Sequence, residues 1–205
     1  MDRKKHWETI YETKSPREVS WYQEHPNKSL QFFKDIGAGV DAQVIDAGGG
    51  ASTLADHLLQ EGYRQITILD VSARALERAK QRLGERAKNV RWIEGDVTQV
   101  NLEPFSYDIW HDRAAFHFLT QAGDRERYVR TLEKSLKPGG HLILSTFATD
   151  GPPRCSGLDV IRYSAEGLER ELGEKFRLIK SVDDIHRTPF DTQQNFIYCH
   201  FQKVT

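Results

Sequence analysis

Apolar and polar positions along the chain follow two alternating periods. Short runs rich in Val, Ile and Leu recur at 43–47, 66–70, 90–94, 107–111 and 141–147 and have the length of buried strands. Apolar residues at helical spacing predict helices over 52–61, 72–83 and 124–136. This alternation predicts an α/β domain whose parallel sheet is covered by helices on both faces.

The C-terminal part of the pattern adds two strands without a crossover helix between them. A helix after Ser164 runs to about Leu172, and strands follow over 176–182 and 195–202 with Pro189 between them. Strands separated by so short a link pair as an antiparallel element. We therefore expect a doubly wound sheet of seven mostly parallel strands, in which the last strand is antiparallel.

The first forty residues read as a helical arm. Trp7 and Tyr11 lie at helical spacing, a turn follows at Ser15, and a second helix through Phe32 and Phe33 ends near Gly37. We expect residues 1–40 to form an arm or lid and residues 41–205 to form one catalytic domain.

A glycine turn between the first strand and the first helix of this domain is the strongest chemical signal. The run Asp46-Ala-Gly-Gly-Gly50 lets backbone approach a ligand at a helix N-terminus, and Asp70 ends the next strand, where it can accept both ribose hydroxyls. A dinucleotide fingerprint would need a third glycine at position 53, which is a threonine. The spacing therefore argues against an NAD enzyme.

Three further motifs arrive in order: Glu94-Gly-Asp96, Tyr107-Asp-Ile-Trp-His111 and Leu136-Lys-Pro-Gly-Gly140. With the glycine turn, the series resembles the class I S-adenosylmethionine-dependent methyltransferases. The resemblance implies a single Rossmann-like domain and S-adenosyl-L-methionine as cofactor. It implies that Asp70 binds the ribose, that Asp96 binds the adenine amine and that Asp46 supports the methionine end. The implied cofactor pocket also includes Gly48, Gly49, Gly50, Val71 and Val97.

Two stretches are similar to the thiopurine S-methyltransferase branch of that family. They are Tyr107–Ala115, with its Asp-Arg-Ala-Ala run, and the aromatic residues of the arm. This resemblance implies that Trp7, Tyr11 and Trp21 enclose the cofactor, and that His111 and Arg113 lie beside it.

Composition removes several alternatives. The 205 residues carry a formal net charge of −1 with both signs interspersed, which argues against nucleic acid or an anionic membrane as partner. The N-terminal segment lacks the apolar stretch of a signal peptide, so we expect a cytoplasmic protein, monomer or homodimer. Two distant cysteines and eight histidines show no metal-ligand spacing, so we expect no metal.

Ligands of such sheets bind beyond the carboxyl ends of the parallel strands, and this places the candidate catalytic residues. Three histidines there can take up a proton near neutral pH, and an acid adjoins the first of them. The catalytic candidates are His111, Asp112, His117 and His186. The acceptor-binding candidates are Phe116, His117, Cys155, His186 and Arg187.

The acceptor is less constrained than the donor. The Asn/Asp-Pro-Pro-Tyr/Phe signature of enzymes acting on planar amines is absent, since Tyr107–Asp112 occupies its place. A small-molecule thiol or chalcogen compound ranks first, because a thiol is already partly ionised at neutral pH. A protein lysine and a small carboxylate held by Arg113, Arg154 or Arg187 are the alternatives. Outside the enzymes, a cofactor-binding regulator without turnover would also fit.

Overall fold

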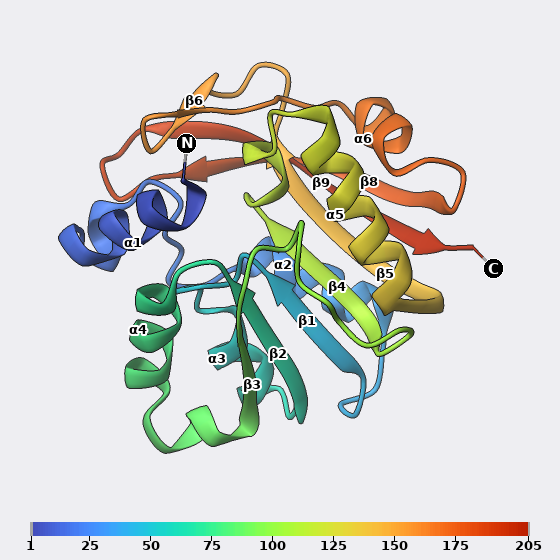
Figure 1. The fold of residues 1–205 in the computed structure, drawn as a ribbon, viewed down its shortest axis with the longest axis horizontal. Helices are drawn as coiled ribbons and strands as arrows, with labels where there is room; N and C mark the ends of the chain where they lie inside the picture. Colours follow the sequence, from blue (N-terminus) through green and yellow to red (C-terminus); the bar gives the residue numbers. More distant parts are fainter. Residues whose placement is uncertain (1, 205) are drawn as a thin grey trace.

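A seven-stranded sheet forms the centre of the molecule (Figure 1). The computed structural model describes residues 2–204, and the side chain of Pro16 lies outside that description. The strand order is β3-β2-β1-β4-β5-β9-β8. Strands β1 to β5 are parallel, and β9 runs antiparallel to both of its neighbours, as the sequence predicts. The strands are β1 (Gln43–Ala47), β2 (Gln65–Asp70), β3 (Val90–Glu94), β4 (Tyr107–Arg113), β5 (Leu136–Phe147), β8 (Phe176–Arg187) and β9 (Gln193–Lys203).

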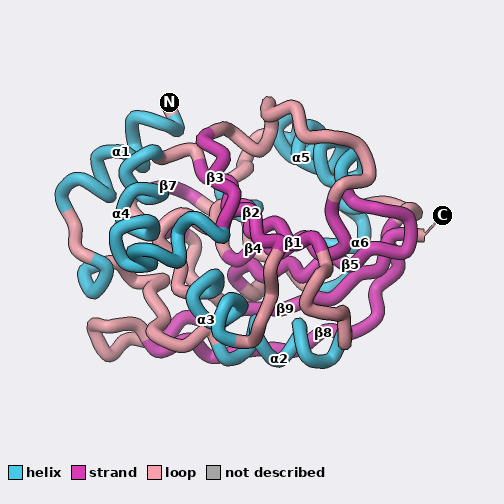
Figure 2. Tube along the Cα trace, turned by 90° about the horizontal axis from the view of Figure 1, so that it is seen from below, coloured by secondary structure: helices cyan, strands magenta, loops and turns pink. Residues whose placement is uncertain are grey.

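Helices cover the two faces of this sheet (Figure 2). Between the helices and the sheet lie two apolar clusters. Phe33, Leu58 and Leu76 bury one face beneath three helices, namely α2 (Asn27–Ile36), α3 (Leu54–Gln60) and α4 (Ala73–Leu83). Leu132 and Leu168 bury the other face beneath α5 (Ala122–Ser135) and α6 (Ala165–Leu172). The Rossmann-like fold expected from the alternating pattern is confirmed.

Several strand boundaries differ from expectation. Strand β5 begins at Leu136 rather than 141, because Leu136 pairs with Tyr107 before a register shift in β4. Strands β8 and β9 extend to Arg187 and from Gln193, since their antiparallel pairing continues to the tip of the hairpin. The link after β5 also contains an unexpected short hairpin, β6 (Arg154–Cys155) with β7 (Leu158–Asp159).

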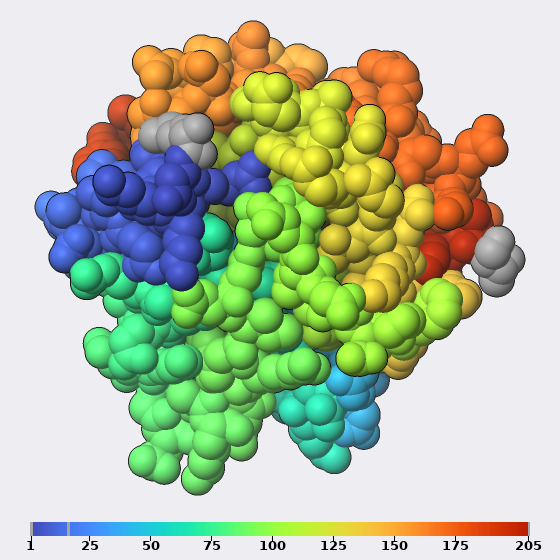
Figure 3. All heavy atoms as spheres, viewed as in Figure 1, coloured from blue at the N-terminus to red at the C-terminus, as the bar shows by residue number. Residues whose placement is uncertain are grey.

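The N-terminal segment contributes both to the core and to an outer layer. Helix α2 packs on the sheet through Leu30, Phe32 and Phe33. Helix α1 (Arg3–Thr13) lies against α4, and a short 3-10 helix, η1 (Pro16–Glu18), follows it. The Glu8 carboxylate accepts hydrogen bonds from the backbone N–H groups of Ala73 and Arg74, in the first turn of α4. An acid at this position complements the helix dipole and fixes α1 against α4. In Figure 3 the N-terminal segment, in blue, forms the outer surface on this side of the molecule.

A buried hydrogen-bond network joins β4 to α5 beneath the site. The Trp110 indole N–H donates to the Tyr128 hydroxyl at 3.0 Å, and this hydroxyl donates to Asp112 at 2.8 Å. Asp112 also accepts from the backbone N–H groups of Ala115 and Phe116, which stabilises the turn after β4. Burial raises the pKa of Asp112 to about 6.

The Tyr128→Phe variant tests this network. Because the pKa of Asp112 is raised above its unfolded value, ionisation of this buried acid reduces stability as pH rises from about 4 through about 6. The Tyr128 hydroxyl offsets part of that cost only when Asp112 is ionised. We expect the variant to lose about 1–3 kcal/mol of unfolding free energy at pH 8 and clearly less at pH 5, measured by chemical denaturation.

Tyr107→Phe, at a buried tyrosine of the same strand outside this network, is the control and should behave alike at both pH values. An equal loss in Tyr128→Phe at the two pH values would show that its hydroxyl does not interact with a titrating Asp112.

Candidate functional site

The glycine turn after β1 brings backbone into contact with three side chains. Gly48 and Gly50 have positive φ angles, of 75° and 26°. A Cβ atom at Gly48 would lie 2.4 Å from the Ala115 Cβ, and one at Gly50 would lie 2.5 Å from Asp70 Oδ2. A Cβ atom at Gly49 would lie 2.4 Å from Asp46 Oδ2. The turn therefore excludes side chains for steric as well as conformational reasons.

Asp70 lies at the end of β2, where its carboxylate faces a cavity. Its Oδ1 accepts a hydrogen bond from the Ser72 N–H at 2.8 Å, and Ser72 itself caps α4. The residue is 7% exposed. Burial, with smaller contributions from the charges of Asp46 and Glu8, raises the pKa of Asp70 to about 7.

A first cavity, of about 830 Å³ and open to solvent, extends from the carboxyl ends of β2 and β3 to those of β4 and β5 and to the amino end of the antiparallel strand β9. Its polar end contains Asp70 and Asp96, and its other end is mostly aromatic. Cys155 lies at that end, and burial raises the pKa of its thiol. The aromatic walls are Trp7, Tyr11, Trp21, Phe118, Phe147 and Phe196.

A second cavity, of about 690 Å³, lies on the other side of the glycine turn and carries charges of both signs. Asp46 supplies a carboxylate, and Arg78 and Arg113 supply guanidinium groups. The Asp46 carboxylate contacts His111, whose other ring nitrogen contacts the Ser29 hydroxyl. Opposite charges in one cavity are what the ammonium and carboxylate of an amino-acid group require.

Arg113 stands between the two cavities and lines both of them. Its Nε donates to the Tyr198 hydroxyl and its Nη1 to the Trp21 carbonyl, each at 2.9 Å. The guanidinium carbon lies 4.7 Å from the centre of the Phe196 ring. Its Nη2 is buried and has no hydrogen-bond partner. This rigidly held cation therefore has one donor group free for a ligand.

Helix α1 forms one wall of the first cavity and is held there by ionic and aromatic contacts. Arg3 forms ion pairs with Asp96 at 2.6 Å and with Asp124 at 2.5 Å. The Trp7 ring meets the rings of Trp21 and Phe118 edge to face, at centroid distances of 5.7 and 5.0 Å. The aromatic residues predicted to enclose the site therefore lie together at its wall.

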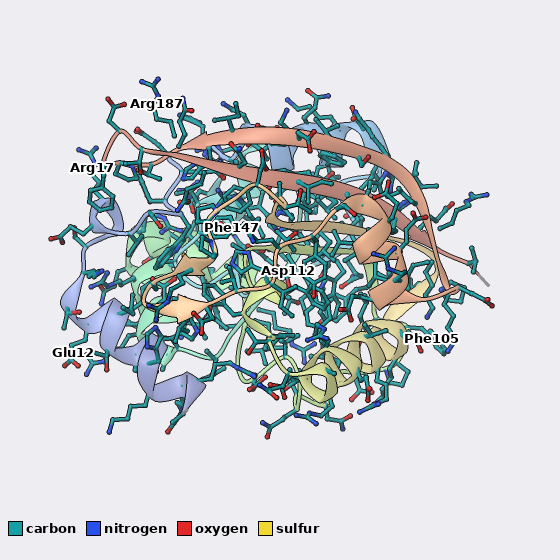
Figure 4. All side chains as sticks on the ribbon, turned by 90° about the horizontal axis from the view of Figure 1, so that it is seen from above. Glu12, Arg17, Phe105, Asp112, Phe147 and Arg187 are labelled. Atoms are coloured by element: carbon teal, nitrogen blue, oxygen red, sulfur yellow. The ribbon has the colours of Figure 1, made fainter. Side chains whose placement is uncertain are left out.

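The structure places several predicted site residues outside both cavities. His117 is fully buried, its Nδ1 accepts from the Phe147 N–H at 3.2 Å, and burial lowers its pKa to about 3. Phe116 packs in the apolar core. Asp112 is hydrogen-bonded to Tyr128 in the network described above, and Figure 4 shows it in the interior of the molecule. We therefore correct the proton-transfer or acceptor-binding roles expected for these three residues.

His186 and Arg187 line neither of the two cavities. Because β8 extends beyond its expected end, both residues belong to the hairpin and line a third, open hollow. His186 Nε2 contacts the Ser20 carbonyl at 2.7 Å, and burial lowers its pKa. Arg187 pairs with Asp191 at the periphery (Figure 4). The structure thus places both residues at this third hollow rather than in the two cavities.

Other residues at the cavities escaped the sequence analysis. Arg3 and Phe196 reach the site only through tertiary folding, so no local sequence motif identifies them as site residues. The sequence gives only a weak indication of a role for Ser29, which is a polar residue on the buried face of α2 beside Leu30 and Phe33. Phe147 ends β5, at the same sheet edge as the other ligand-facing residues.

The two cavities suit the expected cofactor. Acidic groups line the first cavity, and a nucleoside requires such hydrogen-bond acceptors. The glycine turn between the cavities has no room for side chains at its three glycines. Among residues 2–204, no three His, Cys, Asp or Glu side chains are arranged to hold a metal ion. In the same part of the chain, every helix is too short or too polar to cross a membrane.

Sequence similarity to known proteins includes the segment that carries the glycine turn, Asp70 and Asp96. A family profile described as a methyltransferase domain matches residues 44–140. The eEF1A lysine and N-terminal methyltransferase of Danio rerio is 24% identical over 148 residues, which are 71% of this chain and 21% of that protein. The ubiquinone biosynthesis O-methyltransferase of Serratia proteamaculans is 32% identical over 123 residues, 60% of this chain and 49% of that protein. This chain thus spans about half or less of the length of these two relatives.

Solved structures establish the fold over the whole chain. The structure of an S-adenosylmethionine-dependent methyltransferase from Anabaena variabilis superposes with a TM-score of 0.78 at 16% identity, covering 99% of this chain and 96% of that one. The matched profile contains the glycine turn, Asp70 and Asp96, on which the first cavity depends. Residues 44–140 thus match a methyltransferase domain, and the chain has the fold of the S-adenosylmethionine-dependent methyltransferase structures, which supports S-adenosyl-L-methionine as its cofactor.

Proposed function

We propose that this chain transfers the methyl group of S-adenosyl-L-methionine to a small-molecule acceptor, with a thiol or chalcogen compound as the leading class. The observation that carries the proposal is the extent of the first cavity and the residues at its two ends. It runs from Asp70 at the donor end to an aromatic pocket in which Arg113 Nη2 has no partner. Donor and acceptor would share this one cavity.

The donor would bind across the glycine turn. Asp70 would accept the ribose hydroxyls, Asp96 and Val97 would contact the adenine, and Asp46 would face the amino-acid end. Val71 lines the cavity beside Asp70. Arg3 already pairs with one oxygen of Asp96, so helix α1 would order the adenine contact as well as cover it.

The bound cofactor supplies an activated methyl group on a sulfonium, which a nucleophile displaces in line. The chain then has to align the acceptor and exclude water. Trp7, Trp21 and Phe118 would do this by closing the aromatic end of the cavity, and aromatic faces also favour a nearby cation.

Electrostatics of the first cavity favour an anionic acceptor. None of the described histidines lines this cavity, and Asp70 and Asp96 serve the donor in this proposal. An ammonium or alcohol, which must lose a tightly held proton, would find no neutral base there. A thiolate needs little base assistance, and the Arg113 guanidinium would stabilise its charge.

A protein lysine is the second candidate. The Danio rerio relative is named as a lysine and N-terminal methyltransferase, and an exposed apolar pair on the β8–β9 hairpin offers a surface for a protein. Ile185 is 64% exposed and Phe190 is 56% exposed. A small carboxylate, held by Arg113, is a third acceptor class, since Arg154 and Arg187 pair with Asp159 and Asp191 at the surface. A regulator without turnover would bind the cofactor but methylate none of these acceptors.

Donor binding should depend on pH through Asp70. Ribose hydroxyls donate to an ionised carboxylate, so binding favours the deprotonated form of a group whose pKa is about 7. We expect the affinity for S-adenosylhomocysteine, measured by calorimetry, to rise by up to about tenfold from pH 6 to pH 8 and then to level off.

Asp70→Asn should weaken binding by roughly tenfold at pH 8 and remove most of this pH dependence. Asp150→Asn, at an exposed acid outside both cavities, is the matched control. Wild-type affinity that is independent of pH, or an unaltered pH profile in Asp70→Asn, would contradict the ribose role.

The acceptor proposal predicts turnover on thiols before other classes. Purified protein should be assayed with S-adenosyl-L-methionine against thiols, selenite, carboxylates, amines and lysine peptides. With a thiol, Arg113→Gln should lower kcat/KM by about tenfold or more and move the rising limb of its pH profile upward, because a neutral residue no longer favours the thiolate.

Arg187→Gln, which removes a surface guanidinium of the hairpin, should leave both quantities unchanged. Methylation of lysine peptides alone would reject the thiol class in favour of the second candidate. Cofactor binding without product from any of the acceptors would favour the regulator.

A further inference from the structure

Three buried polar side chains form a continuous chain of hydrogen bonds beneath the second cavity. Asp46 and His111 are register partners on the neighbouring parallel strands β1 and β4. His111 Nδ1 lies 2.7 Å from Asp46 Oδ1, and His111 Nε2 lies 2.9 Å from the Ser29 hydroxyl on α2. All three residues are at most 3% exposed. This polar chain crosses an otherwise apolar layer between the helix and the sheet.

The second carboxylate oxygen of Asp46 has no partner in this arrangement. Oδ2 is buried without a hydrogen bond, and it presses against Gly49, where a Cβ atom would lie 2.4 Å away. Asp46 lines the second cavity together with Ser29 and His111. A buried, unpaired carboxylate oxygen is costly unless a ligand supplies a donor.

The carboxylate sets the direction of the first hydrogen bond in this chain. A carboxylate only accepts, so His111 Nδ1–H donates to Asp46, and with a neutral ring the Ser29 hydroxyl donates to Nε2. The chain then carries one negative charge at the cavity, opposite the guanidinium groups of Arg78 and Arg113. That charge complements an ammonium group.

We propose that His111, supported by Ser29, is a positioning residue that fixes the Asp46 carboxylate with Oδ2 toward the ammonium of the cofactor's amino-acid end. The inference rests on the proposed function, because it assigns the second cavity to that end of the cofactor. It also gives His111 a role distinct from proton transfer at the acceptor, since both of its ring nitrogens are engaged.

Two ligands that differ at the amino-acid end separate this role from a general structural one. S-adenosylhomocysteine carries the amino-acid group, whereas 5′-methylthioadenosine keeps the adenosine and sulfur without it. His111→Phe removes both hydrogen bonds and keeps a planar ring. Calorimetry should show its affinity for S-adenosylhomocysteine reduced by about tenfold or more, with the affinity for 5′-methylthioadenosine changed by less than about twofold.

A conservative variant should rescue the effect. His111→Asn keeps an N–H donor near the position of Nδ1 and loses the contact with Ser29, so it should recover most of the selectivity for S-adenosylhomocysteine. Ser29→Ala should lose a smaller part of it, of about two- to fivefold. Ser135→Ala, at a fully buried serine of α5 that bonds the Thr131 carbonyl, and His200→Phe, in β9 outside both cavities, are the matched controls.

The outcomes distinguish this inference from the proposed function. Equal losses for both ligands in His111→Phe, or no loss for either, would overturn the positioning role while leaving methyl transfer intact. If His111→Phe does not fold, the same comparison of ligands in His111→Asn and Ser29→Ala decides the matter. A wild-type protein that binds neither ligand would overturn the proposed function and this inference together.

Discussion

Steric contact between backbone and carboxylates at the glycine turn is the constraint on which the site depends. Gly49 lies against Asp46 and Gly50 against Asp70, so neither position has room for a Cβ atom. The turn thereby fixes two acids on opposite sides of one loop, each facing its own cavity. Both remain buried, and the pKa of Asp70 is raised in consequence.

The arm and the sheet are joined by contacts of a different kind. Glu8 meets the N-terminus of α4, Arg3 meets Asp96, and the Trp21 carbonyl accepts from Arg113. These contacts are ionic or charge-assisted, and several lie near solvent, where salt screens them. Residues of the outer wall are therefore held less firmly than those of the glycine turn, whose position follows from close packing.

The sequence was informative where structure follows from a local pattern. Strands β1 to β3, the glycine turn and Asp70 are encoded within short segments, each with its own strand run and terminal residue. The length of β8 depends on its partner β9, which no local pattern reveals, so His186 was expected in a loop and lies in a strand.

The residues at the aromatic end of the first cavity depended even more on tertiary geometry. Ala114 has a φ of 69°, and the following 3-10 helix, η3 (Phe116–Phe118), redirects the chain so that the His117 ring packs against Phe147. Its position after the end of β4 alone predicts His117 at the ligand-binding edge of the sheet. Cys155 lies beside the cavity because of a two-stranded hairpin whose pattern is too short to recognise.

The division of the site between segments has an evolutionary consequence. The glycine turn, Asp70 and Asp96 lie within the profile match at 44–140, whereas Trp7, Phe147, Cys155 and Phe196 of the cavity wall lie outside it. Much of the aromatic wall is therefore contributed by segments other than those that form the glycine turn. Substitution or insertion in those segments can reshape the aromatic end of the cavity while the turn and its two acids stay in place.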